Sequence, residues 1–376
     1  IVNANYAGAA TSLAWWTLIP IFGNVWRMIG ISWFARGFLE EIIMSTPTCI
    51  VGVAGFDQYG NHTGYQNFEM AAESFGARGV DDGMDCGSPI WNSEGVQGDA
   101  EVWELTGPNV YIGRAFTPNH HGPGRFRGGS AWESLWVVRG SRFVHVTLSS
   151  SGAHNGGIFH KGLFGGYPAP GWKCLWARGV NLEEIAQRDE RIPSSVNEAE
   201  AMLKDGRLKA DDWYCGPLNT WSPNLSDGDL FGVMYSSGPG YGDPIEREHA
   251  RIEKDLANGL ITPNFARKAY GYAKSETKTE ENRAKIRKRR LEESVPALQW
   301  WRAERKRASV GDVGKVVSQT FARSVRMSDK IKDMYMDFWQ LKKFPYTDTG
   351  TTDFHTESPT GFYYPKSPQK SYKKAV

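Results

Sequence analysis

The chain has 376 residues, of which 40% are hydrophobic and 23% are charged, and its formal net charge is +2. This is the composition of a globular protein long enough for two or three domains. The small net charge excludes the strongly basic surface with which proteins bind nucleic acid or anionic membranes. The 42 glycines and 15 tryptophans predict many turns and large buried aromatic surfaces in a β-rich body.

The N-terminal segment, residues 1–46, is predicted to be helical and contains an uncharged stretch over residues 8–26. Pro20 interrupts this stretch, and its large apolar residues mostly recur three or four apart. A buried helical hairpin is therefore favoured over a membrane span. A second helix is expected from Ile31 to Met44. Because the chain starts inside a predicted helix and without the layout of a signal peptide, we interpret it as a fragment that continues from a missing N-terminal part.

Residues 47–245 are predicted to form a β-rich domain with long glycine-rich loops. Its expected strands are CIVGVAGF, AEVWEL, SLWVVRG, RFVHVTLSS and LFGVMYSS. A charged helical insert is expected at residues 181–208, where NLEEIAQRDE and EAEAMLKDG have a helical pattern. The four cysteines form no C-x-x-C pair, which is typical of free thiols in the cytoplasm. The predicted fold class is α+β, with a β-rich central domain flanked by helical regions.

Residues 246–342 are predicted to be helical again. The first helix should begin at Asp243-Pro244, with Asp as N-cap and Pro in the first turn, and the second after Thr262-Pro263. A long charged helix should span residues 278–307. The last segment, residues 343–376, is rich in Tyr, Pro, Thr and Lys. It is predicted to be an extended tail that wraps over a neighbour or is partly disordered.

Three glycines, Gly238, Gly240 and Gly242, stand just before the predicted helix. Backbone amides at such a place can bind an anion, so these glycines are candidate anion ligands, although a structural turn is favoured. Their G-x-G-x-G spacing differs from the G-x-G-x-x-G of dinucleotide-binding folds. Near Lys315 the sequence also lacks the Ser or Thr of a P-loop. We therefore expect no nucleotide site within this chain.

The most unusual segment is TPNHHGPGRFRGGS, which carries His120 and His121 followed by Arg125 and Arg127. Imidazoles can bind metal or transfer protons, and guanidinium groups can bind carboxylate or phosphate. Adjacent histidines on an extended chain point to opposite sides, so at most one would serve a given site. A structural turn is favoured over these roles for all four residues.

His154 and His160 flank a second glycine-dense loop, whose backbone can approach a ligand or another chain closely. We treat these two histidines, with the His and Arg pairs above, as candidate channel or supporting residues of an active site. Asp81, Asp82 and Asp85 do not follow the order of an EF-hand loop, so a turn is favoured over calcium binding. No metal ligand is expected in this segment.

Four blocks in series resemble the hydantoinase B/oxoprolinase family, and together they cover about residues 50–275. They are FGARGVDDGMD at 75–85; EVWEL at 101–105 with GPGRFRGG at 122–129; KGLFGGYP at 161–168; and SGPGYGDP at 237–244 with NGLITPNFAR at 258–267. The Trp-rich helical start, the sequence GDAEVWELTGPNVYIGRAF and the long helical C-terminus are similar to the acetone carboxylase branch of that family.

The resemblance implies that the chain is the C-terminal half of the alpha subunit of a cytoplasmic, ATP-dependent ketone carboxylase. Such an enzyme joins a ketone such as acetone to bicarbonate and forms a β-keto acid such as acetoacetate. The resemblance further implies a hydantoinase A-type beta subunit that binds ATP and Mg²⁺, and a small gamma subunit. It places manganese in the complete alpha subunit, with ligands upstream of this segment.

Two other interpretations stay open. One is the B-type subunit of an ATP-dependent hydantoinase or 5-oxoprolinase. The other is a non-catalytic scaffold subunit that docks an ATPase partner, because the segment shows no complete catalytic constellation.

Overall fold

The computed structural model describes residues 25–43, 49–67, 74–85, 99–150, 161–171, 173–216 and 224–309, with four single residues beyond them. The chain divides into two compact units, residues 1–286 and 287–376, and each is described by itself. Most of the apolar N-terminal stretch, the loop with His154 and His160, and the predicted tail lie outside the described residues. The domain boundaries predicted at residues 46, 245 and 342 stay predictions.

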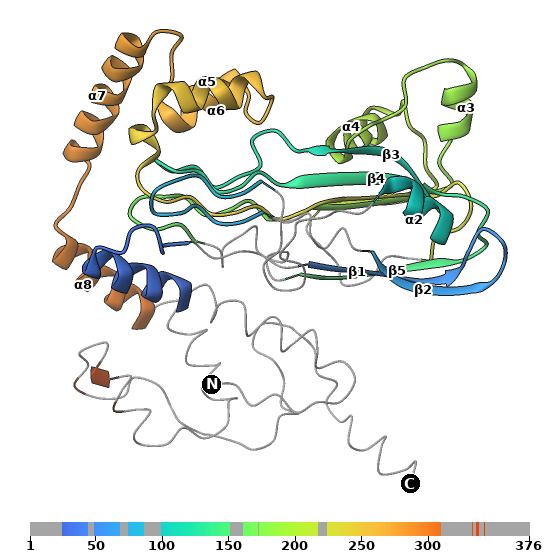
Figure 1. The fold of residues 1–376 in the computed structure, drawn as a ribbon, viewed down its shortest axis with the longest axis horizontal. Coiled ribbons are helices and arrows are strands. Elements are labelled where there is room, and N and C mark those ends of the chain that lie inside the picture. Colours follow the sequence, from blue (N-terminus) through green and yellow to red (C-terminus); the bar gives the residue numbers. More distant parts are fainter. Residues whose placement is uncertain are drawn as a thin grey trace. The chain divides into compact units, whose positions relative to one another are not determined.

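A three-stranded antiparallel sheet has the strand order β2-β1-β5 (Figure 1). Its strands are β1 (Cys49–Phe56), β2 (His62–Asn67) and β5 (Val144–Ser150). The turn between β1 and β2 is held by the carboxylate of Asp57, which accepts hydrogen bonds from the N–H groups of Tyr59 at 2.9 Å and Asn61 at 2.8 Å. Aspartate favours turns because its side chain can bond the backbone in this way.

A five-stranded antiparallel sheet has the strand order β3-β4-β8-β6-β7. Its strands are β3 (Asn109–Phe116), β4 (Trp132–Val138), β6 (Lys173–Arg178), β7 (Asp212–Gly216) and β8 (Leu230–Met234). Strands β4 and β8 lie inside this sheet and are almost wholly buried. The strands predicted in CIVGVAGF, SLWVVRG, RFVHVTLSS and LFGVMYSS are confirmed, and so is the α+β class.

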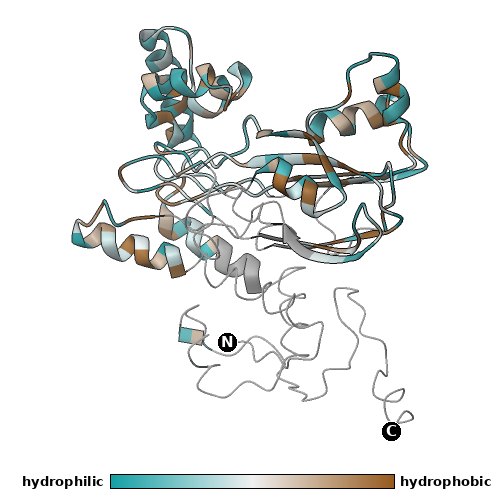
Figure 2. Ribbon diagram, turned by 45° about the vertical axis from the view of Figure 1, so that its right-hand side comes forward, coloured by the Kyte–Doolittle hydropathy of each residue, from teal (hydrophilic) through white to brown (hydrophobic). Residues whose placement is uncertain are grey.

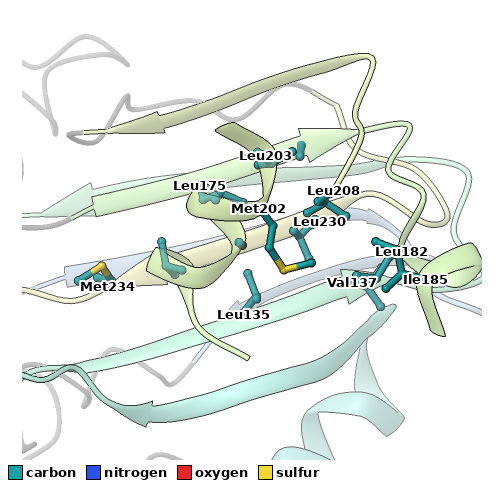
Figure 3. Packing of buried hydrophobic residues seen from close by; sticks show 13 residues of the cluster. Leu135, Val137, Leu175, Leu182, Ile185, Met202, Leu203, Leu208, Leu230 and Met234 are labelled. Carbon is teal, nitrogen blue, oxygen red and sulfur yellow. The ribbon is translucent and has the colours of Figure 1, made fainter. Parts of the chain in front are cut away.

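Strand β4 contributes to two hydrophobic cores, because successive side chains of a strand point to opposite faces. Trp136 and Val138 pack against residues of β1 and β5 and so join the two sheets. Leu135 and Val137 belong to the second core, on the face covered by two helices. Figure 3 shows these leucine, valine and methionine side chains gathered between the sheet and the helices.

These helices are α3 (Leu182–Gln187) and α4 (Val196–Asp205), and both lie within residues 181–208, where helices were predicted. The hydroxyl of Ser195 caps α4 by accepting a hydrogen bond from the N–H of Glu198 at 3.1 Å. Gly206 ends α4 in the left-handed conformation, with φ 79°. Both are common signals for the ends of a helix.

Four glycine-rich loops interlock through their main chains, and we call them together the glycine wall. They are residues 74–85, 117–131, 161–171 and 235–243. The N–H of Gly122 donates to the carbonyl oxygen of Gly238 at 2.8 Å, and the N–H of Gly129 donates to that of Phe75 at 2.8 Å. A Cβ atom added to Gly238 would lie 1.8 Å from the carbonyl oxygen of Phe75. The backbones therefore approach at a distance that only glycine permits.

After β8 the chain forms a 3-10 turn over Pro244–Glu246 and then α5 (His249–Ala257), α6 (Pro263–Tyr270) and α7 (Glu276–Glu292). Thr262 caps α6 as predicted. Asp243 caps the turn, but the helix that was expected to begin there begins only at His249, because Arg247 and Glu248 have extended ψ angles of 131° and 136°. Helix α7 is almost wholly hydrophilic, whereas the strands carry many hydrophobic residues (Figure 2). None of the helices within the described ranges is long and apolar enough to cross a membrane.

Three predicted elements are wrong. The stretch AEVWEL forms helix α2 (Ala100–Thr106), because its short apolar run fits either period and Ala, Glu and Leu favour helix. The helix expected from Ile31 to Met44 runs instead over residues 25–36 and ends where Gly37 adopts φ 79°. The long charged helix is interrupted between α7 and α8 (Ala297–Ser309), because Pro296 lacks the N–H that a continuous helix needs.

Candidate functional site

An open cavity of about 590 Å³ lies between α5 and the glycine wall, and most of the residues that line it are charged or polar. The wall contributes three aspartates and one arginine, and the segment around α5 contributes the rest. The lining residues are Asp81, Asp82, Asp85, Arg127, Arg247, Ala250, Arg251, Lys254, Asp255, Asn258 and Leu260.

Helix α5 presents one polar side to this cavity. Arg251, Lys254 and Asp255, together with Asn258 at the end of the helix, occupy positions i, i+3, i+4 and i+7, which places them on one face. Ile252 lies outside this set and packs in the core between α5 and α6. The helix therefore separates a charged side from an apolar side.

Arg127 is buried, with 5% of its surface exposed, and its guanidinium is shared between two carboxylates. Nη1 donates to Oδ1 of Asp85 at 2.7 Å, Nη2 donates to Oδ2 of the same residue at 3.1 Å, and Nε donates to Asp255 at 3.1 Å. Burial by itself would lower the pKa of this guanidinium, but the carboxylates outweigh burial and raise the pKa of Arg127. The group expected to contact an anion is thus paired inside the protein.

Arg247 is fully buried and shares one of these carboxylates, that of Asp255, with Arg127. Nη1 and Nη2 donate to the two oxygens of Asp82 at 2.7 and 2.8 Å, and Nη2 also donates to Asp255 at 2.8 Å. Asp255 therefore bridges Arg127 and Arg247. Bidentate pairs of this kind are among the strongest hydrogen-bonded contacts in proteins. Within the described part of the chain, Nε of Arg247 is buried without a hydrogen-bond partner.

A third arginine lies nearer to solvent. Arg251 donates to Asp81 at 2.6 Å and lies 3.4 Å from Asp82. Burial acts to raise the pKa of Asp82, but hydrogen bonds and positive charge from Arg247 and Arg127 hold the pKa of this carboxyl below its usual value. The Arg251–Asp81 pair is partly exposed, with 31% and 43% of the side chains accessible, so it adds little to stability.

The site as a whole is close to electrically neutral. Four aspartates face three arginines and Lys254 across the lining of the cavity. The side chains of Lys254 and Asn258 are exposed and make no hydrogen bond or ion pair with other described residues. Chemically, the cavity can offer one ammonium and one amide group to a polar ligand, while the buried arginines are held by carboxylates.

The two adjacent histidines are buried and have different partners. His120 donates from Nε2 to the carbonyl oxygen of Tyr235 at 2.9 Å, and burial lowers the pKa of His120 to about 4. Nε2 of His121 lies 3.0 Å from the hydroxyl of Tyr270. Burial, together with the charges of Arg127 and other neighbours, holds the pKa of His121 well below its usual value. Both rings are therefore neutral at pH 7, and neither lines the cavity.

The other expected site residues are placed as follows. Arg125 is exposed, with its guanidinium carbon 5.4 Å from the ring centroid of Phe126. The N–H groups of Gly238, Gly240 and Gly242 donate to the carbonyl oxygens of Gly129, Tyr167 and Leu163. These three amides are thus already bonded within the wall and are not free for an anion.

His154 and His160 lie outside the described residues, so the structure does not place them. In the described ranges no group of three or more His, Cys, Asp or Glu residues could hold a metal ion.

Sequence reasoning missed Arg247, Arg251 and Asp255, and it treated Asp82 and Asp85 as turn residues. No local signal identified this set, because Arg247 precedes α5, which begins at His249, and the interval of four between Arg247 and Arg251 is therefore not a helical spacing.

The chain is similar to known proteins over most of its length. A family model described as hydantoinase B/oxoprolinase matches residues 1–244. The chain is 34% identical over 359 residues to the acetone carboxylase alpha subunit of Xanthobacter autotrophicus, covering 90% of this chain and 45% of that one. It is 27% identical over 223 residues to the acetophenone carboxylase delta subunit of Aromatoleum aromaticum, covering 58% of this chain and 31% of that one.

A solved structure is similar as well. The nucleotide-free structure of acetone carboxylase, from work on the mechanism of ATP-dependent acetone carboxylation, matches with a TM-score of 0.75 at 32% identity. The match covers 93% of this chain and 46% of that chain. The chain thus spans less than half the length of these relatives.

Proposed function

The chain belongs to the hydantoinase B/oxoprolinase family, and from this we propose that it is the C-terminal part of the alpha subunit of an ATP-dependent ketone carboxylase. The proposed reaction joins a small ketone such as acetone to bicarbonate and forms a β-keto acid such as acetoacetate. One observation carries this proposal: the chain resembles the acetone carboxylase alpha subunit along nearly its whole length, in sequence and in fold.

The proposed enzyme is a cytoplasmic hetero-oligomer. A hydantoinase A-type beta subunit would bind ATP and Mg²⁺, a small gamma subunit would complete the assembly, and manganese would be held by the complete alpha subunit. The proposal places the manganese ligands in a part of the alpha subunit that this chain does not include. We derive no chemical step through that ion.

For this chain we propose a positioning role beside the reaction. Joining two substrates requires that both are held in a fixed geometry. Asp255 links Arg127 of the glycine wall to Arg247 beside α5, and this buried pairing fixes the helix against the wall. Lys254 and Asn258 remain available at the cavity to a polar substrate group. Contact of His120, His121 and Arg125 with a substrate channel stays a hypothesis.

A non-catalytic scaffold role for the segment is the second candidate. It is favoured by one observation, namely that the buried arginines are paired with carboxylates of the same chain. The two candidates differ in what they predict for Lys254 and Asn258. A substrate-positioning segment needs these side chains for turnover, whereas a scaffold does not.

The test uses the native complex with ATP, Mg²⁺, labelled bicarbonate and acetone, followed by borohydride reduction to trap any β-keto acid as a stable hydroxy acid. We expect labelled product only when the ketone and ATP are both present. Hydrolysis of a hydantoin or of 5-oxoproline without incorporation of label would replace the proposal by a lactam hydrolase. If Lys254→Ala and Asn258→Ala leave kcat and KM unchanged, the segment is a scaffold.

A further inference from the structure

The connection between α7 and α8, in the second unit, exposes an unusual number of apolar side chains. Every residue from 291 to 300 is exposed. The large apolar side chains among them are Leu291 (77% exposed), Val295 (52%), Leu298 (59%) and Trp300 (54%). We call residues 287–303 the junction surface.

Single exposed apolar residues are ordinary on a protein surface. Several large ones within ten residues are not, and such patches mark interaction sites. The ring of Trp300 lies beside that of Trp301, with centroids 6.5 Å apart, so two indoles stand next to each other. Tryptophan is enriched among the residues that dominate the energy of protein–protein interfaces.

The junction surface is also basic. Residues 287–303 contain five basic and two acidic residues, a net charge of +3, whereas the whole chain carries +2. Arg289 and Glu293 are 3.9 Å apart and highly exposed, so that pair neutralises little. Lys288 and Arg302 have no ion-pair partner among the described residues. Positive charge around an apolar patch complements a partner with acidic groups around an apolar groove.

The position of this surface in the chain supports a separate binding role. The matched hydantoinase B/oxoprolinase region ends at residue 244, so the junction surface lies outside the family core. The similarity to the acetone carboxylase alpha subunit covers 90% of this chain, so it continues beyond residue 244. The segment that exposes these side chains is therefore an addition to the family core that this relative shares at least in part.

We propose that the junction surface docks a separate protein subunit, whose own surface has an apolar groove for Leu298 and Trp300 and acidic side chains around that groove. Leu298 and Trp300 supply the buried apolar contact, and Lys288 and Arg302 supply the electrostatic complementarity. This inference rests on the proposed function, which includes partner subunits, and it assigns to one of them a docking surface on this chain; it requires no particular reaction, so the failure of the carboxylation assay would not overturn it.

The experiment compares complexes purified with the wild-type chain, with Leu298→Ser/Trp300→Ser and with Lys288→Glu/Arg302→Glu. The matched control is Tyr59→Ser/Leu105→Ser, which removes two apolar side chains that are 70% and 68% exposed in the first unit. Native mass spectrometry and size-exclusion chromatography measure which subunits remain bound. A photo-crosslinking amino acid at Val295 identifies the partner and the segment that it touches.

We expect each junction variant to weaken one partner subunit at least tenfold, while the control keeps the complex and all chains keep their circular dichroism spectra. Salt should weaken the wild-type complex more than the Lys288→Glu/Arg302→Glu complex. The crosslink should fall on an acidic segment of another subunit. The proposal is overturned by intact complexes in both junction variants. It is equally overturned by crosslinks to the same chain or to a second copy, or by binding to phosphatidylserine vesicles without a protein partner.

Discussion

Replacing Asp255 by Asn tests the role of the buried ion pairs most directly. Asp255 has 3% of its surface exposed and accepts hydrogen bonds from Arg127 at 3.1 Å and from Arg247 at 2.8 Å. The amide keeps the size of the side chain but removes its negative charge, so two buried guanidinium groups lose a shared partner. Breaking a buried pair in this way costs about 3–5 kcal/mol. Because the amide oxygen can still accept one hydrogen bond, we expect a loss of about 3 kcal/mol.

Urea denaturation at pH 7, followed by tryptophan fluorescence, measures this loss as a lower midpoint. The matched control is Asp81→Asn, because that side chain is 43% exposed and its pair with Arg251 should contribute less than about 1 kcal/mol. Hydrogen exchange should show faster opening of α5 in Asp255→Asn than in Asp81→Asn. If the two variants lose the same small amount of stability, the buried pairing does not hold α5 against the glycine wall.

Three further outcomes follow from the geometry. The pKa of His120 is about 4 in the folded chain against about 6.5 when unfolded, so its contribution to stability is full above pH 6.5 and should fall by roughly 3 kcal/mol as the pH drops to 4. Denaturation at several pH values should show this slope, and His120→Gln should reduce it but leave the part due to His121, whose pKa is also lowered. Gly238→Ala should prevent normal folding, because the added Cβ would lie 1.8 Å from a carbonyl oxygen. The control is Gly228→Ala, whose Cβ meets nothing within 4 Å; it should lower the free energy of unfolding by about 1 kcal/mol, through its positive φ alone. Soluble yield and melting temperature separate the two variants. Ser195→Ala removes the N-cap of α4 and should lower the free energy of unfolding by about 1 kcal/mol, and an unchanged midpoint would show that the cap is dispensable.

Apolar runs with clear turns allowed β1, β4, β5 and β8 to be predicted from the sequence. Strands β2, β3, β6 and β7 were missed because their patterns are mixed. In β3 the register shifts between Tyr111 and Gly113, and a Cβ at Gly113 would lie 1.9 Å from the carbonyl oxygen of Ser194. A glycine required by such a close approach interrupts the alternation on which strand prediction depends.

The candidate site was only partly predictable, for a different reason. Arg127 was identified as a cation of interest, but its partners Asp85 and Asp255 are 42 and 128 residues away in the chain. Local spacing does not show which distant carboxylate will pair with a guanidinium, so an arginine that is fully paired looks the same as one that is free. The family was therefore identified from the glycine-rich blocks, and the pattern of charged residues did not contribute to that identification.

The glycine wall also restricts how this region can be redesigned. Where one main chain lies against another with no room for a Cβ, as at Gly128, Gly238 and Gly240, the shape of the surface is set by the backbone and cannot be varied one side chain at a time. A change of ligand preference would then have to come from the exposed positions opposite. Lys254 and Asn258 are such positions, so a library of variants randomised at these two positions would vary the side chains offered to a ligand while leaving the backbone of the glycine wall unchanged.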